Sequence, residues 1–225
     1  ALLFGFTLGA NANEITNNLK NKIDNFFNQT LSEMFPMAEF GLSSGNSDKV
    51  TGSIIAINPL SDINDKSTST FFQGSLFLSD DSRETINLGL ATRNLVSDDT
   101  MLVGANIFYD HELDHNHQRA SIGLEAITSV GSITYNEYWG LSDKKTGVDG
   151  FKEEALDGRD LKLGIPLPYL PTTSLNIRSF QWEGVDGATD LEGEDFSLRA
   201  SISRFNIEIG HRDFDGATDD EDFII

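Results

Sequence analysis

The chain has 225 residues, of which 38% are hydrophobic and 23% charged, and its formal net charge at pH 7 is −20. No window of about 18 uncharged apolar residues occurs, which argues against a helical membrane protein. The negative charge repels phosphate backbones, so no nucleic-acid partner is expected, and sixteen Phe residues argue against a disordered chain. A soluble β domain and a membrane barrel remain, because a barrel exposes only alternate strand residues to lipid.

The first 36 residues differ in pattern from the rest. Residues 1–12 are apolar and end in Ala-Asn-Ala, which is typical of a signal-peptide cleavage site. We therefore expect 1–12 to be part of a signal peptide, with a buried N-terminal strand as the alternative. Residues 13–36 space their apolar side chains three to four positions apart until Pro36, which predicts a short helical segment.

From residue 37 onward the apolar period is two, which predicts strands. In 85–93, Ile86, Leu88 and Leu90 share one face, while Asn87, Gly89 and Arg93 share the other. The predicted strands are 37–45, 50–59, 68–78, 84–95, 100–110, 117–127, 132–141, 158–167, 172–183, 195–203 and 204–213. The motif Asp-Gly-Ala-Thr-Asp at 186–190 recurs at 215–219, and by this parallel Phe223–Ile225 begins a twelfth, truncated strand. The fold class predicted is all-β, an antiparallel up-and-down transmembrane barrel over residues 37–225.

The polar faces of these strands combine small residues with Arg and Glu, as side chains that share a closed lumen must. A soluble sandwich also alternates, but its polar face needs no small residues. The predicted lumen-facing residues are Arg93, Arg119, Glu125, Arg178, Arg199, Glu208 and Arg212. The predicted lipid-facing residues are Leu88, Leu90, Ile122, Leu124, Leu198 and Ile207. The inward charges either fill the barrel as paired side chains or form a polar wall along which an extended segment slides, or both.

Short and long connections alternate along the chain. The short ones are 96–99, 128–131, 168–171 and the turn at Ser203-Arg204, and the long ones are 111–116, 142–157 and 184–194. Segments at the elaborated end hold 22 of the 36 acidic residues and only four Lys or Arg. A sheet whose net charge is concentrated at one end, with little along the strands, is typical of a membrane-crossing barrel. The alternation of short and long connections is typical of an outer-membrane barrel, which has short periplasmic turns and longer outer loops.

The stretch 110–117 is the most site-like, because it holds three His and three carboxylates that could bind zinc. It lies between two predicted strands, however, and we interpret it as a hairpin loop. No Gly-x-Ser-x-Gly elbow, phosphate loop or dinucleotide fingerprint occurs. We therefore expect no enzyme activity, and neither catalytic residues, cofactor-binding residues nor metal ligands.

Three segments in order resemble the N-terminal barrel of the intimin/invasin family, the inverse autotransporters. They are 72–74 leading into 83–93, then Met101–Asp110, then Asn116–Glu125, and the likeness extends over about residues 14–183. The family's run Glu-Glu-Arg-Pro-Ala-Asn-Gly is only partly kept, as Glu-Glu-Ala-Leu-Asp-Gly at 153–158. The resemblance implies a twelve-stranded barrel, exported to the bacterial outer membrane, through which a C-terminal passenger reaches the surface. It also implies that the helical segment over 13–36 lies in the periplasm.

The expected partners are outer-membrane lipid and lipopolysaccharide, the barrel-assembly machinery and the chain's own passenger. Adhesion would reside in the passenger, which these residues do not include. Two alternatives stay open at this point: a stand-alone pore or structural barrel, and a soluble β sandwich that binds sugar or protein.

Overall fold

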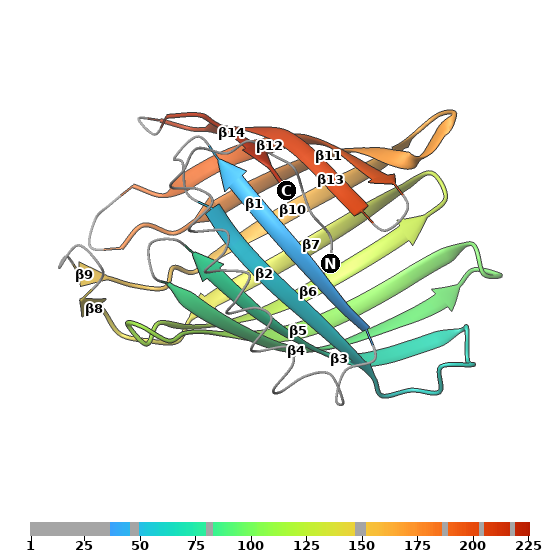
Figure 1. Cartoon of the computed structure of the whole chain (residues 1–225), viewed down its shortest axis with the longest axis horizontal. Coiled ribbons are helices and arrows are strands. Elements are labelled where there is room, and N and C mark those ends of the chain that lie inside the picture. Colours follow the sequence, from blue (N-terminus) through green and yellow to red (C-terminus); the bar gives the residue numbers. More distant parts are fainter. Residues whose placement is uncertain are drawn as a thin grey trace, which may run out of the picture.

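The computed structural model describes residues 37–45, 50–79, 83–146, 152–185, 189–202, 205–216 and 219–225. Within them, twelve strands form a closed antiparallel barrel (Figure 1). Each strand lies beside the barrel strands that precede and follow it in the chain, and the first strand lies beside the last. The strands are β1 (Met37–Gly45), β2 (Val50–Pro59), β3 (Thr68–Ser79), β4 (Glu84–Val96), β5 (Met101–Glu112), β6 (Gln118–Thr128), β7 (Gly131–Gly140), β10 (Gly158–Leu167), β11 (Leu170–Trp182), β12 (Leu191–Ile202), β13 (Phe205–Phe214) and β14 (Glu221–Ile224). Two short strands, β8 (Lys145–Thr146) and β9 (Lys152–Glu153), pair with each other in the connection between β7 and β10.

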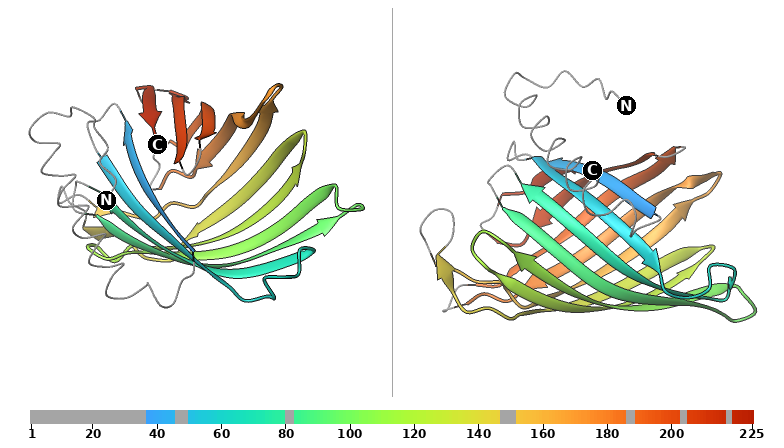
Figure 2. Two further views of the ribbon diagram at one scale, coloured as in Figure 1. Left: turned by 45° about the vertical axis from the view of Figure 1, so that its right-hand side comes forward. Right: turned by 60° about the horizontal axis from the view of Figure 1, so that its bottom comes forward.

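The wall closes where the first and last strands meet. β1 pairs with β14 through Ser44↔Ile224 and Gly45↔Phe223, so the two ends of the sheet lie side by side (Figure 2). Over these two pairs, closure removes the unpaired edges that an open sheet would present, whereas residues 37–43 of β1 pair with β2 alone. The predicted twelve-stranded antiparallel barrel is therefore confirmed. No helix in the described ranges is long and apolar enough to cross a membrane.

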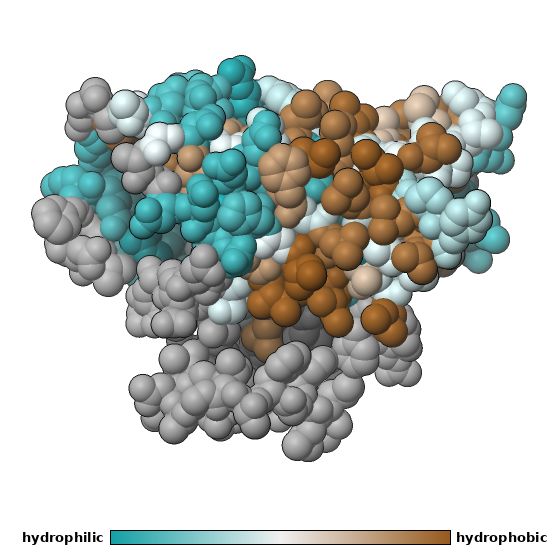
Figure 3. Space-filling model, turned by 90° about the horizontal axis from the view of Figure 1, so that it is seen from above, coloured by the Kyte–Doolittle hydropathy of each residue, from teal (hydrophilic) through white to brown (hydrophobic). Residues whose placement is uncertain are grey.

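The two faces of the wall differ because the strands alternate. The six side chains predicted to face lipid, Leu88, Leu90, Ile122, Leu124, Leu198 and Ile207, are between 40% and 55% exposed on the convex face. Figure 3 shows apolar side chains gathered in a band over one side of the barrel, with hydrophilic residues crowded toward the end that carries β8 and β9.

The opposite face is concave and mixes small with large side chains. A Cβ atom on Gly89 would overlap the Phe108 ring, and one on Gly123 would overlap the side-chain amides of Asn106 and Asn136. These glycines are directly opposite their large neighbours in the register, Gly89↔Phe108 and Gly123↔Asn136. The concave face is thus filled by polar and aromatic side chains that need glycine beside them.

The connections at the two ends of the barrel have different lengths. At one end the turns are short, and Ser97, Asp98 and Asp99 adopt φ values of 54°, 53° and 63°, a left-handed conformation that Asp tolerates better than most residues. In the longer β2–β3 connection at this end, hydrogen bonds from the Ser67 hydroxyl (2.6 Å) and amide (2.9 Å) lower the pKa of Asp65. The other end, here called the acidic end, carries the longer connections 113–117, 141–157, 183–190 and 215–220.

The structure departs from the predicted strands in two places. β12 begins at Leu191 rather than at residue 195, because Leu191 and Gly193 continue the ladder opposite Trp182 and Phe180. The β8–β9 hairpin was not predicted, since two-residue strands leave no periodic signal. The signal peptide expected over 1–12 and the helix expected over 13–36 lie outside the described residues, and the helix is not confirmed.

The alternation predicts different tolerance to charge on neighbouring residues of β6. Leu124, 55% exposed on the convex face near the middle of the strand, should lose about 2–4 kcal/mol of folding free energy when replaced by Arg in a bilayer. Ser121→Arg, on the concave face, is the matched control and should lose less. Urea unfolding in lipid vesicles, followed by the fluorescence of Trp139 and Trp182, measures both. Equal losses would contradict the assignment of the two faces.

Candidate functional site in the barrel lumen

The concave face brings together side chains from strands that are not neighbours. The Arg119 guanidinium on β6 lies 5.3 Å from the Trp182 ring centroid on β11, although β7 and β10 run between them. Such a contact is possible only on the inside of a curved wall. By strand alternation and register, all seven residues predicted to face the lumen lie on the same concave face as Arg119. The lumen is therefore the candidate site.

Asp195 on β12 is the centre of the main charge cluster. It is directly opposite Arg178 on β11 and Arg212 on β13 in the register. Arg178 Nη2 lies 2.8 Å from Asp195 Oδ2 in an ion pair, and Arg212 Nε donates to Asp195 Oδ1 at 2.7 Å. Arg212 Nη1 also contacts Glu221 Oε2 at 3.4 Å. One carboxylate buried to 7% exposure therefore holds two arginines.

A second cluster is centred on Arg119. Its Nε and Nη2 atoms donate to Asp110 Oδ2 at 3.0 and 2.8 Å, and its guanidinium lies 4.8 Å from the Tyr138 ring centroid. The Tyr138 hydroxyl donates to Asp160 Oδ2 at 3.0 Å, and the same oxygen is 3.9 Å from Arg178 Nη1. Asp160 therefore joins the two clusters into one network across the inner wall.

Aromatic rings support the arginines. Phe180, 4% exposed, lies beneath both Arg178 and Arg212, with its centroid 5.0 and 5.8 Å from their guanidinium carbons. Phe214 meets Phe180 edge to face at 5.9 Å. A cation over an aromatic face contributes about 0.5–2 kcal/mol, more as water is excluded. The rings therefore restrict the motion of the arginine side chains whose charge the carboxylates neutralise.

The remaining predicted lumen residues lie nearer the short-turn end. Arg93 Nε pairs with Glu125 Oε1 at 2.5 Å, above the ring of Phe71. Glu208 accepts a hydrogen bond from the Ser197 hydroxyl and lies 3.8 Å from Lys162 Nζ. Arg199 is opposite Glu208 in the register, and its side chain is exposed.

Sequence reasoning found most of the cations and Glu125, the partner of Arg93, but it missed four other carboxylates. Asp110, Asp160, Asp195 and Glu221 were absent from the prediction, as were the aromatic platforms. The period-two pattern of 158–167 would have put Asp160 on the polar face with Lys162, because they are two residues apart. Nothing in the sequence indicates which arginine each carboxylate meets.

The His-rich stretch is divided by the structure. Asp110 belongs to the lumen network, while His111 lies on the other face of β5 and contacts Asn116 Oδ1 at 2.7 Å. Across the ranges that the structure describes, no group of three or more His, Cys, Asp or Glu residues is arranged to hold a metal ion.

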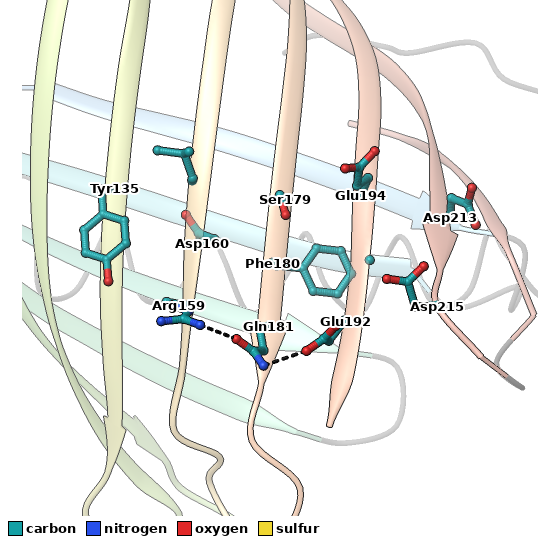
Figure 4. A pocket seen from close by; sticks show the side chains of 12 residues that line it. Tyr135, Arg159, Asp160, Ser179, Phe180, Gln181, Glu192, Glu194, Asp213 and Asp215 are labelled. Carbon is teal, nitrogen blue, oxygen red and sulfur yellow. Dashed lines mark hydrogen bonds between the residues drawn. The ribbon is translucent and has the colours of Figure 1, made fainter. Parts of the chain in front are cut away.

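A hollow of about 640 Å³ lies on the convex face at the acidic end. Arg159 Nη2 donates to Gln181 Oε1 at 2.7 Å, and Gln181 Nε2 donates to Glu192 Oε1 at 2.6 Å, so three adjacent strands are linked in a row (Figure 4). Glu194, Asp213 and Asp215 also line it. The hollow carries the acidic character of this end onto the outer surface of the wall.

The family model for the inverse autotransporter β-domain matches residues 8–221. The chain is 28% identical over 116 residues to a putative attaching and effacing protein homolog of Escherichia coli strain K12, covering 51% of this chain and 39% of that protein. It is 26% identical over 144 residues to invasin of Yersinia enterocolitica, covering 61% of this chain and 17% of that protein. It is 29% identical over 104 residues to the inverse autotransporter adhesin YeeJ of E. coli K12, covering 45% of this chain and 4% of that protein. The chain thus spans well under half the length of these curated relatives.

Solved structures share the barrel. One, from work on in-meso crystallization of membrane proteins, superposes with a TM-score of 0.73 at 22% identity over 83% of this chain and 80% of that one. KdgM porin superposes with a TM-score of 0.54 at 8% identity over 84% of this chain and 97% of that one. These likenesses concern the fold alone. Because the family model spans nearly the whole chain, the chain belongs to the inverse autotransporter family as its β-domain, a barrel of the bacterial outer membrane.

Proposed function

We propose that this barrel anchors a longer protein in the outer membrane and exports a C-terminal passenger through its lumen to the cell surface. The observation that carries the proposal is the inner wall, where charges occur in pairs on a polar surface. An extended segment can slide along such a wall, because arginines already held by carboxylates bind a passing chain weakly. The relatives named adhesin and invasin are much longer than this chain, and we assign adhesion to the passenger.

The proposal gives each face of the wall a role. The seven charged residues Arg93, Arg119, Glu125, Arg178, Arg199, Glu208 and Arg212 face the lumen. The six apolar residues Leu88, Leu90, Ile122, Leu124, Leu198 and Ile207 face lipid. The acidic end stands among lipopolysaccharide head groups, and the barrel-assembly machinery inserts the sheet. No catalytic role is proposed: outer membrane phospholipase A of E. coli superposes with a TM-score of 0.50 at 10% identity, a likeness of fold alone.

Passenger display is tested on whole cells. The full gene product, with an epitope tag at its C-terminus, should bind antibody on intact cells. The same tag placed in the short turn at Ser129-Val130 is the control and should bind only after permeabilisation, because that turn lies at the periplasmic end. A C-terminal tag that stays hidden while the barrel is folded, as judged by heat-modifiable migration, would reject export. Ion conductance of the purified barrel in planar bilayers would then favour the stand-alone pore.

The lumen network makes a separate prediction about stability. Asp195→Asn removes the charge that holds Arg178 and Arg212, whose side chains are each 28% exposed. We expect a loss of about 2 kcal/mol, below the value for fully buried pairs because water reaches the arginines. Asp213→Asn, on the exposed convex face of β13, is the control and should change little. Urea midpoints in lipid vesicles measure both, and an unaltered midpoint for Asp195→Asn would show that the pairing contributes nothing to folding.

A further inference from the structure

Two neighbouring turns at the short-turn end of the barrel are apolar. They are the β6–β7 turn, with Val130 80% exposed, and the β10–β11 turn, with Tyr169 99% and Leu170 54% exposed. Because β7 pairs with β10, these turns are neighbours, at the end opposite β8 and β9 (Figure 1). The sequence has no charged residue over 126–136 or over 163–177. An uncharged sector therefore runs from these strands to the tips of their turns.

The other described connections of this end are charged. The β4–β5 turn, residues 97–100, carries two aspartates. The β2–β3 connection surrounds the exposed Leu60 and Ile63 with two aspartates and a lysine. Carboxylates are costly beside lipid, whereas uncharged side chains are not. The two sectors of this end therefore suit different surroundings, water for the charged one and a membrane boundary for the uncharged one.

Tyr169 occupies its position against the preference of the turn. The pair Leu167↔Leu170 leaves Pro168 and Tyr169 as the two central residues. Tyr169 has a φ of 67°, and a left-handed residue after proline is the pattern of a type II turn, whose second central position favours Gly or Asn. Bulky residues rarely adopt this conformation. Packing within the barrel does not compensate for it, because Tyr169 is almost fully exposed.

The length of β10 relates Tyr169 to a membrane boundary. Arg159 is the last charged residue on the convex face of β10 before the turn, and Leu161, Leu163 and Ile165 then continue that face at 39–45% exposure. Tyr169 is ten residues beyond Arg159 in the sequence. A strand tilted by about 45° needs about 9–11 residues to cross the hydrocarbon. With Arg159 at the outer boundary of the hydrocarbon, Tyr169 is at the inner one, where tyrosine is enriched because its ring is apolar and its hydroxyl polar.

We propose that Tyr169 is an interfacial anchor, which binds the phospholipid head-group layer of the periplasmic leaflet and holds this side of the barrel in the membrane. The ring lies against the upper part of the acyl chains, and its hydroxyl reaches the head groups. The β4–β5 turn, with its two aspartates, stands in water instead. The anchor rests on the proposed assignment of the convex face to lipid, and it adds the lipid contact of one turn.

The depth of the turn is measured with single spin labels, which the absence of cysteine from the chain allows. The full chain is reconstituted in phosphatidylcholine vesicles with one label, at Tyr169→Cys, Leu124→Cys or Asp98→Cys. Collisions of the label with oxygen, which concentrates in lipid, are compared with collisions with a nickel complex that stays in water. The oxygen-to-nickel ratio should be high at residue 124, low at residue 98 and intermediate at residue 169.

The three labels separate the anchor from the assignment on which it rests. A ratio at residue 169 as low as that at residue 98, with a high ratio at residue 124, overturns the anchor alone. A low ratio at residue 124 overturns the lipid-facing assignment and the anchor with it. A label at residue 169 that is shielded from both reagents indicates contact with a second copy and also overturns the anchor. Heat-modifiable migration verifies folding, and Val130→Cys replaces Tyr169→Cys if the latter does not fold.

Substitution of Tyr169 has effects of opposite sign for an anchor and for a simple turn residue. Asparagine adopts the left-handed conformation more readily than tyrosine, so Tyr169→Asn would raise the urea midpoint in vesicles if only the turn mattered. Loss of the ring from lipid should lower that midpoint instead, and Tyr169→Trp should retain the parent value. Asp99→Asn, at a φ of 63° in the β4–β5 turn, is the matched control and should not lower it. A raised or unchanged midpoint for Tyr169→Asn contradicts the anchor.

Discussion

In the hydrocarbon of a membrane, backbone amides and carbonyls find no water, so each must be paired within the protein. A sheet meets this requirement only by closing on itself. The chain does so through the pairs Ser44↔Ile224 and Gly45↔Phe223, which join strands more than 170 residues apart in sequence. Once the wall is closed, every strand has two neighbours, one face must be convex and the other concave, and the period-two pattern assigns each side chain to one of them.

Closure also creates the lumen and its charge network. On a flat sheet, Arg119 and Trp182 would be separated by the width of two strands, but the curvature of the wall brings them to 5.3 Å. Charges inside a narrow barrel lose part of their hydration, which is costly unless an opposite charge is within reach. The arrangement around Asp195 meets that condition with one carboxylate for two guanidiniums, and Phe180 beneath them limits their motion. A wall of this kind is polar yet has few unpaired charges.

The acidic end differs from the lumen in the elements that hold its polar side chains in place. In the middle of the barrel, Arg119, Arg178 and Arg212 pair with carboxylates of adjacent strands, so the register holds them in place, whereas Arg93 reaches Glu125 across β5. At the acidic end, His117 of the β5–β6 hairpin lies 3.9 Å from Glu153, which belongs to a two-residue strand that few backbone bonds restrain. Strand register therefore holds these ion pairs of the wall, whereas the contacts at the acidic end depend on how the connections lie.

Much of this architecture was determined by local sequence alone. Most strand ends were predicted within two residues, because the alternation of apolar and polar side chains is a property of each strand by itself. The convex positions of Leu124 and its five counterparts, and the concave positions of the seven charges, follow from the same alternation. What only the tertiary structure decided is which side chains meet. The partners of Arg178 and Arg212 and the extension of β12 back to Leu191 depend on strand register and wall curvature. These arise from pairing between distant segments, and no local period in the sequence records them.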